Sequence, residues 1–251
     1  MKDTFLAAAL CAVASLNSFG APCVNGTLAD LTAGLSGGGR CTVGAAGQWS
    51  LSTFGLFDMG GGGFNALVTA SDIFVSFTSV TSVGGGPGFT VSFSDAPRGN
   101  NFFTASAGMS QSQNWRSMFV IESGPALQSI NSSLQNPNVT NPQPDVSNGS
   151  VSLNTAVFSG NNMFINDVTL LALPGLLIPG SGSADVIIPL PNALTGLIIQ
   201  DIFSIQGGLN GVSSLLSYTN TFYADPVPEP ATFVLLGVGL AGMAALRRRN
   251  G

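Results

Sequence analysis

The 251-residue chain contains no histidine, and only 8% of its residues are charged. Histidine is the commonest general base and the commonest transition-metal ligand, so its absence removes both from any site. Between residues 21 and 225 the basic residues are Arg40, Arg98 and Arg116 alone. So few cations cannot neutralise a phosphate backbone, and the sequence therefore predicts no nucleic-acid partner.

Acidic residues are also sparse, and none forms a close pair such as Asp-x-Asp. Of the 12 acidic residues, all but Asp3 and Glu229 lie between residues 21 and 225. A glycosidase could still assemble two carboxylates from distant strands, and Asp167, Asp185 and Asp201 occur in or beside predicted strands. We expect these three to cap turns or face solvent, so the sequence predicts no catalytic residue.

Metal-binding patterns are lacking as well. Two cysteines without histidine are too few for a structural zinc site. No loop has the dense Asp, Asn and Gly spacing of an EF-hand, although calcium could still bind to carboxylates and loop carbonyls. We therefore predict no metal site and no cofactor, with calcium as the open alternative.

The chain is rich in residue types that favour strands and turns. It contains 33 Gly, 14 Pro and 17 Phe, a composition that suits strands joined by tight turns. Apolar and polar residues alternate over 73–77 and 89–93, on either side of a glycine-rich turn, which indicates a hairpin. Further strands are expected at 117–121, 151–157, 163–171, 185–190, 196–205 and 215–223.

These segments predict an all-β secreted body over residues 21–225. About nine or ten strands with turn punctuation are typical of an antiparallel β-sandwich. The stretch 136–149 is rich in Asn and Pro, and we expect a loop or a subdomain boundary there.

The first 20 residues have the layout of a signal peptide. Lys2 precedes an apolar run over 5–16, and small residues follow, which is the order that export signals show. Cleavage after Gly20 places Ser18 and Gly20 at the two small-residue positions. A buried N-terminal helix is the alternative.

The other end carries three features in order: Pro228-Glu229-Pro230, an apolar stretch over 231–246, and Arg247, Arg248 and Arg249. Sixteen residues span about 24 Å as a helix, and flanking arginines can reach the headgroups of a hydrocarbon core of about 30 Å. We predict a single transmembrane helix over 231–246, with the arginines in the cytoplasm and the body outside.

These three features resemble the PEP-CTERM sorting signal. The resemblance implies that an exosortase-type enzyme in the inner membrane recognises residues 226–251, processes them near Pro228, Glu229 and Pro230, and releases the protein to the cell surface or an exopolysaccharide matrix. An anchor that is never cleaved is the alternative. Residues 23–31 and 37–44 also resemble the opening of a group of PEP-CTERM proteins.

Cys11 lies in the predicted signal peptide, which leaves Cys23 and Cys41 in the exported body. In an oxidising compartment we expect them to form a disulfide. Without histidine to activate it, neither cysteine is expected to be a catalytic nucleophile.

The aromatic residues with polar atoms, Trp49, Trp115, Tyr218 and Tyr223, could form a platform on which sugar rings stack. Packing in the core or on a half-buried sheet face is the competing expectation, and we favour it.

Three classes of function therefore remain. The sequence favours a non-enzymatic component of the cell surface or matrix, followed by a module that binds extracellular polysaccharide, and then a secreted hydrolase.

Overall fold

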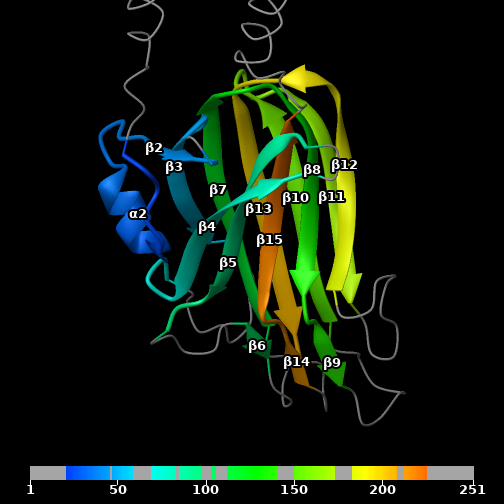
Figure 1. Ribbon diagram of the computed structural model, residues 1–251. Coiled ribbons are helices and arrows are strands. Elements are labelled where there is room, and N and C mark those ends of the chain that lie inside the picture. The colour runs from blue at the N-terminus through cyan, green and yellow to red at the C-terminus, as the bar shows by residue number, and fades with distance from the viewer. Residues whose placement is uncertain are drawn as a thin grey trace, which may run out of the picture.

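The computed structural model describes residues 21–45, 47–58, 69–82, 85–97, 103–105, 112–140, 150–172, 183–207 and 212–224. Two six-stranded sheets pack face to face and form a β-sandwich (Figure 1). The first, here the front sheet, contains β1 (Gly26–Thr27), β4 (Ile73–Thr81), β5 (Pro87–Asp95), β15 (Ser217–Ala224), β8 (Leu127–Gln135) and β12 (Ser183–Leu194), in that order.

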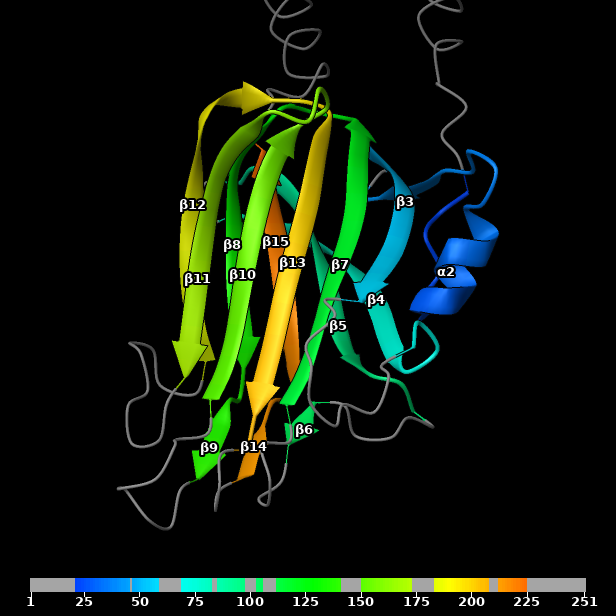
Figure 2. The ribbon, with the colours of Figure 1, turned by 180° about the vertical axis from the view of Figure 1, so that it is seen from behind.

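The second, here the back sheet, faces the viewer in Figure 2. Its strands, in order, are β11 (Phe164–Ala172), β10 (Ser150–Ser159), β13 (Leu197–Gln206), β7 (Ser112–Ser123), β3 (Trp49–Asp58) and β2 (Cys41–Val43). A small third sheet of β6 (Thr104–Ala105), β14 (Val212–Ser214) and β9 (Asn138–Thr140) closes one end of the sandwich (Figure 1). All of the strand pairs are antiparallel.

The alternation of side chains explains why these segments are strands. In β13 and β15 every second residue is buried and its neighbours are partly exposed, which is the period of a strand with one face on a core. The predicted β-sandwich is therefore confirmed. The hairpin predicted around residues 73–93 is β4 and β5, which pair along their whole length.

Aromatic rings fill the space between the two sheets. Phe93 stacks on Tyr218 with ring centroids 4.7 Å apart, and Trp115 lies 4.2 Å from Phe203. Such pairs each add about 0.5–1.5 kcal/mol beyond the area that they bury. Buried residues before and after the segment 136–149 belong to one hydrophobic cluster.

Several elements differ from the expectation. The sequence predicted neither β3 nor β8, and a short helix, α2 (Leu28–Gly34), lies outside the strands. Thr27 and Asp30 form a capping box at the start of α2, in which the Thr27 backbone N–H donates to Asp30 and the Asp30 N–H donates to the Thr27 hydroxyl. Such reciprocal bonds satisfy two of the N–H groups at a helix start.

The chain leaves the sandwich at the end of β15, and we call this end of the molecule the tail end. Ala224 pairs with Leu127, the first residue of β8, and β7 finishes just before that residue. Because β7 and β10 both run antiparallel to β13, β10 also finishes at the tail end. The turn between β10 and β11 therefore lies there too, and the third sheet lies at the opposite end (Figures 1 and 2).

The predicted signal peptide (1–20), the predicted transmembrane helix (231–246) and the predicted sorting residues from Pro228 to Arg249 lie outside the described residues. Within the described part of the chain, no helix is long and apolar enough to cross a bilayer.

Candidate functional site

A buried polar cluster lies in the middle of the sandwich. Asp201 on β13 and Thr155 on β10 are directly opposite each other in the back sheet, and Asn220 and Ser132 are opposite each other in the front sheet. The Thr155 hydroxyl donates to Asp201 Oδ1 at 2.8 Å, and Asn220 Nδ2 donates to Asp201 Oδ2 at 2.7 Å. The Ser132 hydroxyl donates to Asn220 Oδ1 at 2.7 Å. The cluster therefore joins the two sheets by hydrogen bonds.

Burial controls the ionisation of this cluster. Because desolvation penalises the charged form, burial raises the pKa of Asp201 from 3.8 to about 6, against the opposing hydrogen bonds from Asn220 and Thr155. Burial and the nearby Asp201 charge raise the pKa of the Tyr218 phenol far above its usual value. The phenol lies 3.0 Å from the hydroxyl of Ser117, so both polar atoms are paired.

The location of Asp201 corrects the sequence-based expectation. We expected a turn cap or a solvent-facing carboxylate, but only 1% of Asp201 is exposed. It occupies the inner face because its neighbours in β13 alternate around it: Ile199 and Phe203 are buried as well. A carboxyl that is sealed between two sheets can hold or release a proton, but it cannot touch a substrate in this arrangement.

The other two aspartates are on strands. Asp167 is exposed on β11 and accepts a hydrogen bond from Asn154 Nδ2 at 3.3 Å, so the expectation that it faces solvent is confirmed. Asp185 lies on β12, where its backbone pairs with Ser133. The structure does not bring these residues together with Asp201, which is on another strand and another face. Among the residues described, no group of three or more His, Cys, Asp or Glu could hold a metal ion.

The four polar aromatics divide between core and surface. Trp49, Trp115 and Tyr218 are at most 1% exposed, so the expectation of core packing is confirmed for them. Tyr223 is half-buried on the outer face of β15. Its ring lies close to Gly88 on β5, where an added Cβ would come within 3.1 Å of Tyr223 Cδ1. The structure thus leaves one of the four at the surface rather than a platform of several rings.

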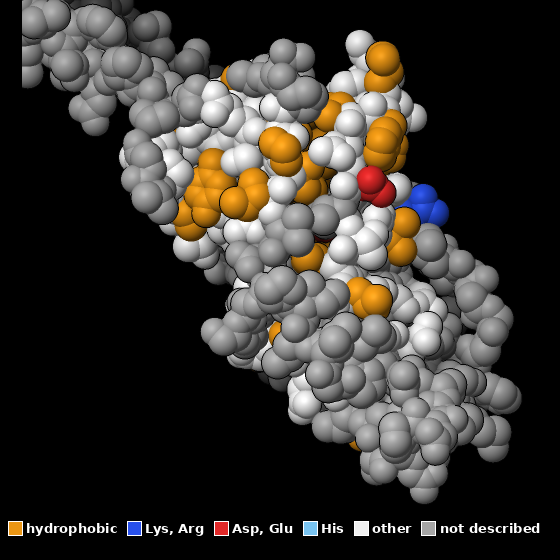
Figure 3. Space-filling model, turned by 90° about the vertical axis from the view of Figure 1, so that its right-hand side faces the viewer, with side chains coloured by type: hydrophobic (Ala, Val, Ile, Leu, Met, Phe, Trp, Pro, Cys, Tyr) orange, Lys and Arg blue, Asp and Glu red, His pale blue; other side chains and the backbone are white. Residues whose placement is uncertain are grey.

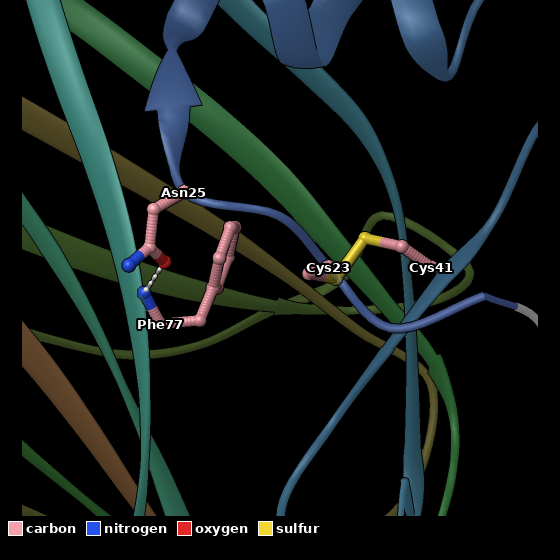
Figure 4. The surroundings of a disulfide bond; sticks show 4 residues. All are labelled: Cys23, Asn25, Cys41 and Phe77. Atoms are coloured by element: carbon pink, nitrogen blue, oxygen red, sulfur yellow. Dashed lines mark hydrogen bonds between the residues drawn. A yellow bond between two sulfur atoms is a disulfide. The ribbon is translucent and has the colours of Figure 1, made fainter.

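The predicted disulfide between Cys23 and Cys41 is confirmed, and it belongs to a corner that ties the N-terminal segment to both sheets (Figure 4). The Cys23 N–H donates to Thr42 O at 2.9 Å, which holds the segment against β2 of the back sheet. Two residues later, Asn25 Oδ1 accepts from the Phe77 N–H of β4 at 2.9 Å, in the front sheet.

A pocket of about 460 Å³ opens between this corner and α2. Its walls are mostly apolar, and Arg40 is among the residues that line it. The Arg40 guanidinium forms an ion pair with Glu122 on β7, with 2.6 Å between Nη2 and Oε2. Both partners are partly exposed, so the pair contributes at most about 1 kcal/mol.

The outer face of β5, β15 and β8 is built from hydroxyl and amide side chains. Residues opposite one another in antiparallel strands share a face, so Thr90 and Asn131 stand on either side of Thr221. The hydroxyls of Thr90 and Thr221 are 2.9 Å apart. The outward positions of these three strands, none of which is charged, are Gly88, Thr90, Ser92, Ser94, Ser129, Asn131, Ser133, Gln135, Ser217, Thr219, Thr221 and Tyr223.

Sequence reasoning missed both the buried cluster and this hydroxyl face. A serine or threonine in a strand is usually expected to face outward, so nothing in the sequence indicated that Thr155 and Ser132 are buried. The hydroxyl face could have been found, because hydroxyl residues occupy every second position over 90–94 in β5 and over 217–223 in β15.

Comparison with known proteins identifies the C-terminus. A family model described as the PEP-CTERM protein-sorting motif matches residues 226–249. The motif implies that the protein is exported and that the C-terminus is a membrane-anchored sorting signal. No curated protein matches the chain.

Among solved structures, the chain is similar to a TmCBM61 module in complex with β-1,4-galactotriose, with 11% identity and a TM-score of 0.28 over 60% of this chain and 88% of that one. It is also similar to the xylan-binding module CBM15, with 15% identity and a TM-score of 0.26 over 69% and 98% of the two chains. A CBM4 structure matches with 10% identity and a TM-score of 0.23 over 68% and 82%. Likenesses this distant carry no argument about what this chain binds.

Proposed function

We propose that this protein, which carries the PEP-CTERM sorting motif, is a component of the cell surface or extracellular polysaccharide matrix that acts without catalysing a reaction. The observation that carries the proposal is the motif match at residues 226–249. An exosortase-type enzyme of the inner membrane is the partner that the motif implies. The tail holds the precursor in the membrane, and cleavage near Pro228, Glu229 and Pro230 then releases the body.

We expect the cleavage junction to be exposed. Proline restricts the preceding residue to extended conformations, so Pro228 and Pro230 keep this segment out of a helix and open to a protease. Arg247, Arg248 and Arg249 hold the far end of the span in the cytoplasm.

Intact-mass analysis of the mature protein from the native host tests the processing. We expect a mass that lacks both the signal peptide and residues 231–246. Replacing the three arginines with glutamine should impair both the retention of the tail in the membrane and its processing, so that unprocessed protein accumulates. A mature protein that still contains residues 231–246 would show that the tail is a permanent anchor.

The lack of catalysis is supported by the chemistry of the available groups. The chain has no histidine, and Asp201, the aspartate with the raised pKa, is sealed in the core. We expect purified protein to leave neutral polysaccharides and esters intact. Hydrolysis that disappears when one exposed carboxylate is replaced, with the fold retained, would overturn this part of the proposal.

A second candidate function is binding of a neutral polysaccharide to the hydroxyl face. Its specific support is the uncharged outer face of β5, β15 and β8, where side chains such as Thr90, Thr221 and Asn131 can both donate and accept hydrogen bonds, as sugar hydroxyls do. The double variant Thr90→Val/Thr221→Val keeps the side-chain shapes and removes the paired hydroxyls. Retention on neutral glycan resins should fall for this variant and stay unchanged for Asn154→Ser, on the other sheet. Equal retention of the two variants would remove this candidate.

A further inference from the structure

The outward residues of β10 become more apolar toward the tail end. Outward side chains of β10 run from Ser152 through Asn154 and Ala156 to Phe158, the last of them beside the tail end. In β7 the outward residues run in order Asn114, Arg116, Met118, Val120 and Glu122, so two apolar residues precede a charged one at the tail end.

Outward residues at or near the tail-end limits of four strands form one apolar row. Ile198 of β13 pairs with Phe158 on one side and with Val120 on the other. Phe158 in turn pairs with Phe164 of β11, and their rings meet edge to face with centroids 5.8 Å apart. This set of four residues is called the apolar row below.

The turn that joins β10 to β11 extends the apolar row beyond the sheet. Met163 is 69% exposed and Phe164 is 59% exposed, although large apolar side chains normally lose such exposure on folding. Hydrophobic side chains also reach the surface in the upper part of the face shown in Figure 3, where acidic and basic atoms lie beside them. Beside the apolar row, Glu122 is paired with Arg40, so this pair adds no net charge.

The front sheet places an aromatic residue at the same end. Tyr223 is the last outward residue of β15, and Gly88 lies between it and Val80 of β4 in the register of the sheet. The other outward residues of β15 are Ser217, Thr219 and Thr221. Tyr223 is therefore the one aromatic residue on the outer face of this strand, and it lies at the tail end. Tyrosine is enriched where proteins meet the headgroups of a bilayer.

The short connection to the tail determines that the tail end of the sandwich lies next to the membrane surface. Six residues, 225–230, separate Ala224 from the predicted span at 231–246, and they can reach at most about 20 Å when fully extended. Strand spacings of about 4.8 Å and a sheet spacing of about 10 Å place the apolar row at a comparable distance from Ala224. A tether this short supplies a high local concentration of the membrane surface.

We infer that, in the precursor whose tail is inserted, the tail end of the sandwich rests on the outer leaflet of the inner membrane. Met163, Phe164 and Tyr223 enter the headgroup region, and the apolar row lies against it. This contact fixes the height of the cleavage junction above the bilayer. The inference rests on the tail insertion of the proposed function, and cleavage of the tail removes the tether and frees the body.

Quenching by brominated lipids tests the contact in the full chain. Phe164→Trp places a reporter at the tail end, and Leu216→Trp places one at the opposite end, where Leu216 is 64% exposed. Each variant is reconstituted into vesicles of phosphatidylethanolamine and phosphatidylglycerol with bromine on the acyl chains near the headgroups. The buried Trp49 and Trp115 of the unsubstituted chain give the background.

We expect loss of emission beyond the background for Phe164→Trp and none for Leu216→Trp. Met163→Trp repeats the measurement if Phe164→Trp does not fold. If the protein floats with the vesicles but neither tail-end reporter is quenched more than Leu216→Trp, the contact is refuted and the tail insertion stands. If the protein does not float with the vesicles, the inserted tail is refuted and the contact with it.

Discussion

At the scale of single residues, the carboxyl of Asp201 links the stability of the fold to pH. Its pKa is about 6 in the folded state and 3.8 in the absence of burial. The folded state therefore holds this proton more tightly than the unfolded chain does. Below pH 3.8 the Asp201 carboxyl is protonated in both states and does not make the free energy of unfolding depend on pH. As the pH rises from 3.8 to about 6, the free energy of unfolding falls, and above that it is lower by about 3 kcal/mol.

Replacing Asp201 with asparagine should remove this titration. An asparagine can accept from Asn220 Nδ2 and donate to the Thr155 hydroxyl, so both partners stay paired. We expect Asp201→Asn to unfold at a higher urea concentration than the wild type at pH 7, by up to about 3 kcal/mol in unfolding free energy. The two proteins should converge near pH 4.

The exposed Asp167→Asn variant is the control, because it changes the same formal charge without burial. If Asp201→Asn were the less stable protein at pH 7, the ionised carboxylate would be stabilising the fold and our reading of the cluster would be wrong.

Gly124 makes a different prediction at this scale. Its φ of 147° and its place against the Trp49 ring leave no room for a side chain, because an added Cβ would lie 2.3 Å from Trp49 Cδ1. We expect Gly124→Ala to destabilise the protein by about 1–3 kcal/mol through overpacking. Thermal unfolding would measure this, with Gly34→Ala as the control, since nothing lies within 4 Å of its Cβ position. A Gly124→Ala protein as stable as the control would contradict the packing at the start of β3.

At the scale of elements, regular alternation decided what the sequence could predict. β13 and β15 were recognisable because apolar residues fill all but one of the inward positions of each strand, the exceptions being Asp201 and Asn220. β8 was not recognisable, because Ser132 and Ser133 are both buried, so polar residues occupy positions on both of its faces. In β3, Thr53 has a φ of 54°, and the register with β7 shifts there, so the apolar pattern loses its phase. α2 is too short for a helical period to show.

The candidate site was less predictable than the fold for a related reason. The residues that form the cluster with Asp201 come from β8, β10 and β15, which are far apart in the sequence. Only the pairing of the strands brings them to one layer, and no spacing along the chain records it. The disulfide was predictable because Cys23 and Cys41 are the cysteines that remain once Cys11 is assigned to the signal peptide.

The N-terminal corner gives a prediction at the scale of elements. The Cys23–Cys41 bond closes a loop with a sequence separation of 18 and clips β1 and α2 to the edge of the sandwich. We expect Cys23→Ser/Cys41→Ser to lose about 3 kcal/mol of unfolding free energy, because the open chain gains conformational entropy when it unfolds.

Urea unfolding of this double variant should match that of the wild type in reductant. Thiol titration of the unfolded, unreduced wild type should find no free thiol. Two free thiols per chain would show that the bond does not form in the exported protein.

At the scale of the whole molecule, the shortage of charge shapes how the protein can associate. The chain has a net charge of −5 spread over 251 residues, so its long-range electric field is weak. Contacts made by hydroxyl and apolar groups are not screened by salt, unlike those between exposed charges.

We therefore expect the mature protein to stay with the matrix when the salt concentration is raised, and to leave it when a soluble neutral glycan or urea is added. Washing isolated matrix with each solution and quantifying the released protein would test this. Release by salt alone would indicate an electrostatic attachment instead.

The bonds at the N-terminal corner also bear on the predicted removal of the signal peptide. The Ala21 carbonyl accepts from the Thr42 N–H at 2.9 Å, and the disulfide follows two residues later, so the first described residue is already fastened to the sandwich. The predicted cut after Gly20 would need this stretch of backbone free and extended. We therefore expect removal of the signal peptide to come before the N-terminal segment pairs with β2, so a variant that is cut slowly should also be slow to form the Cys23–Cys41 bond.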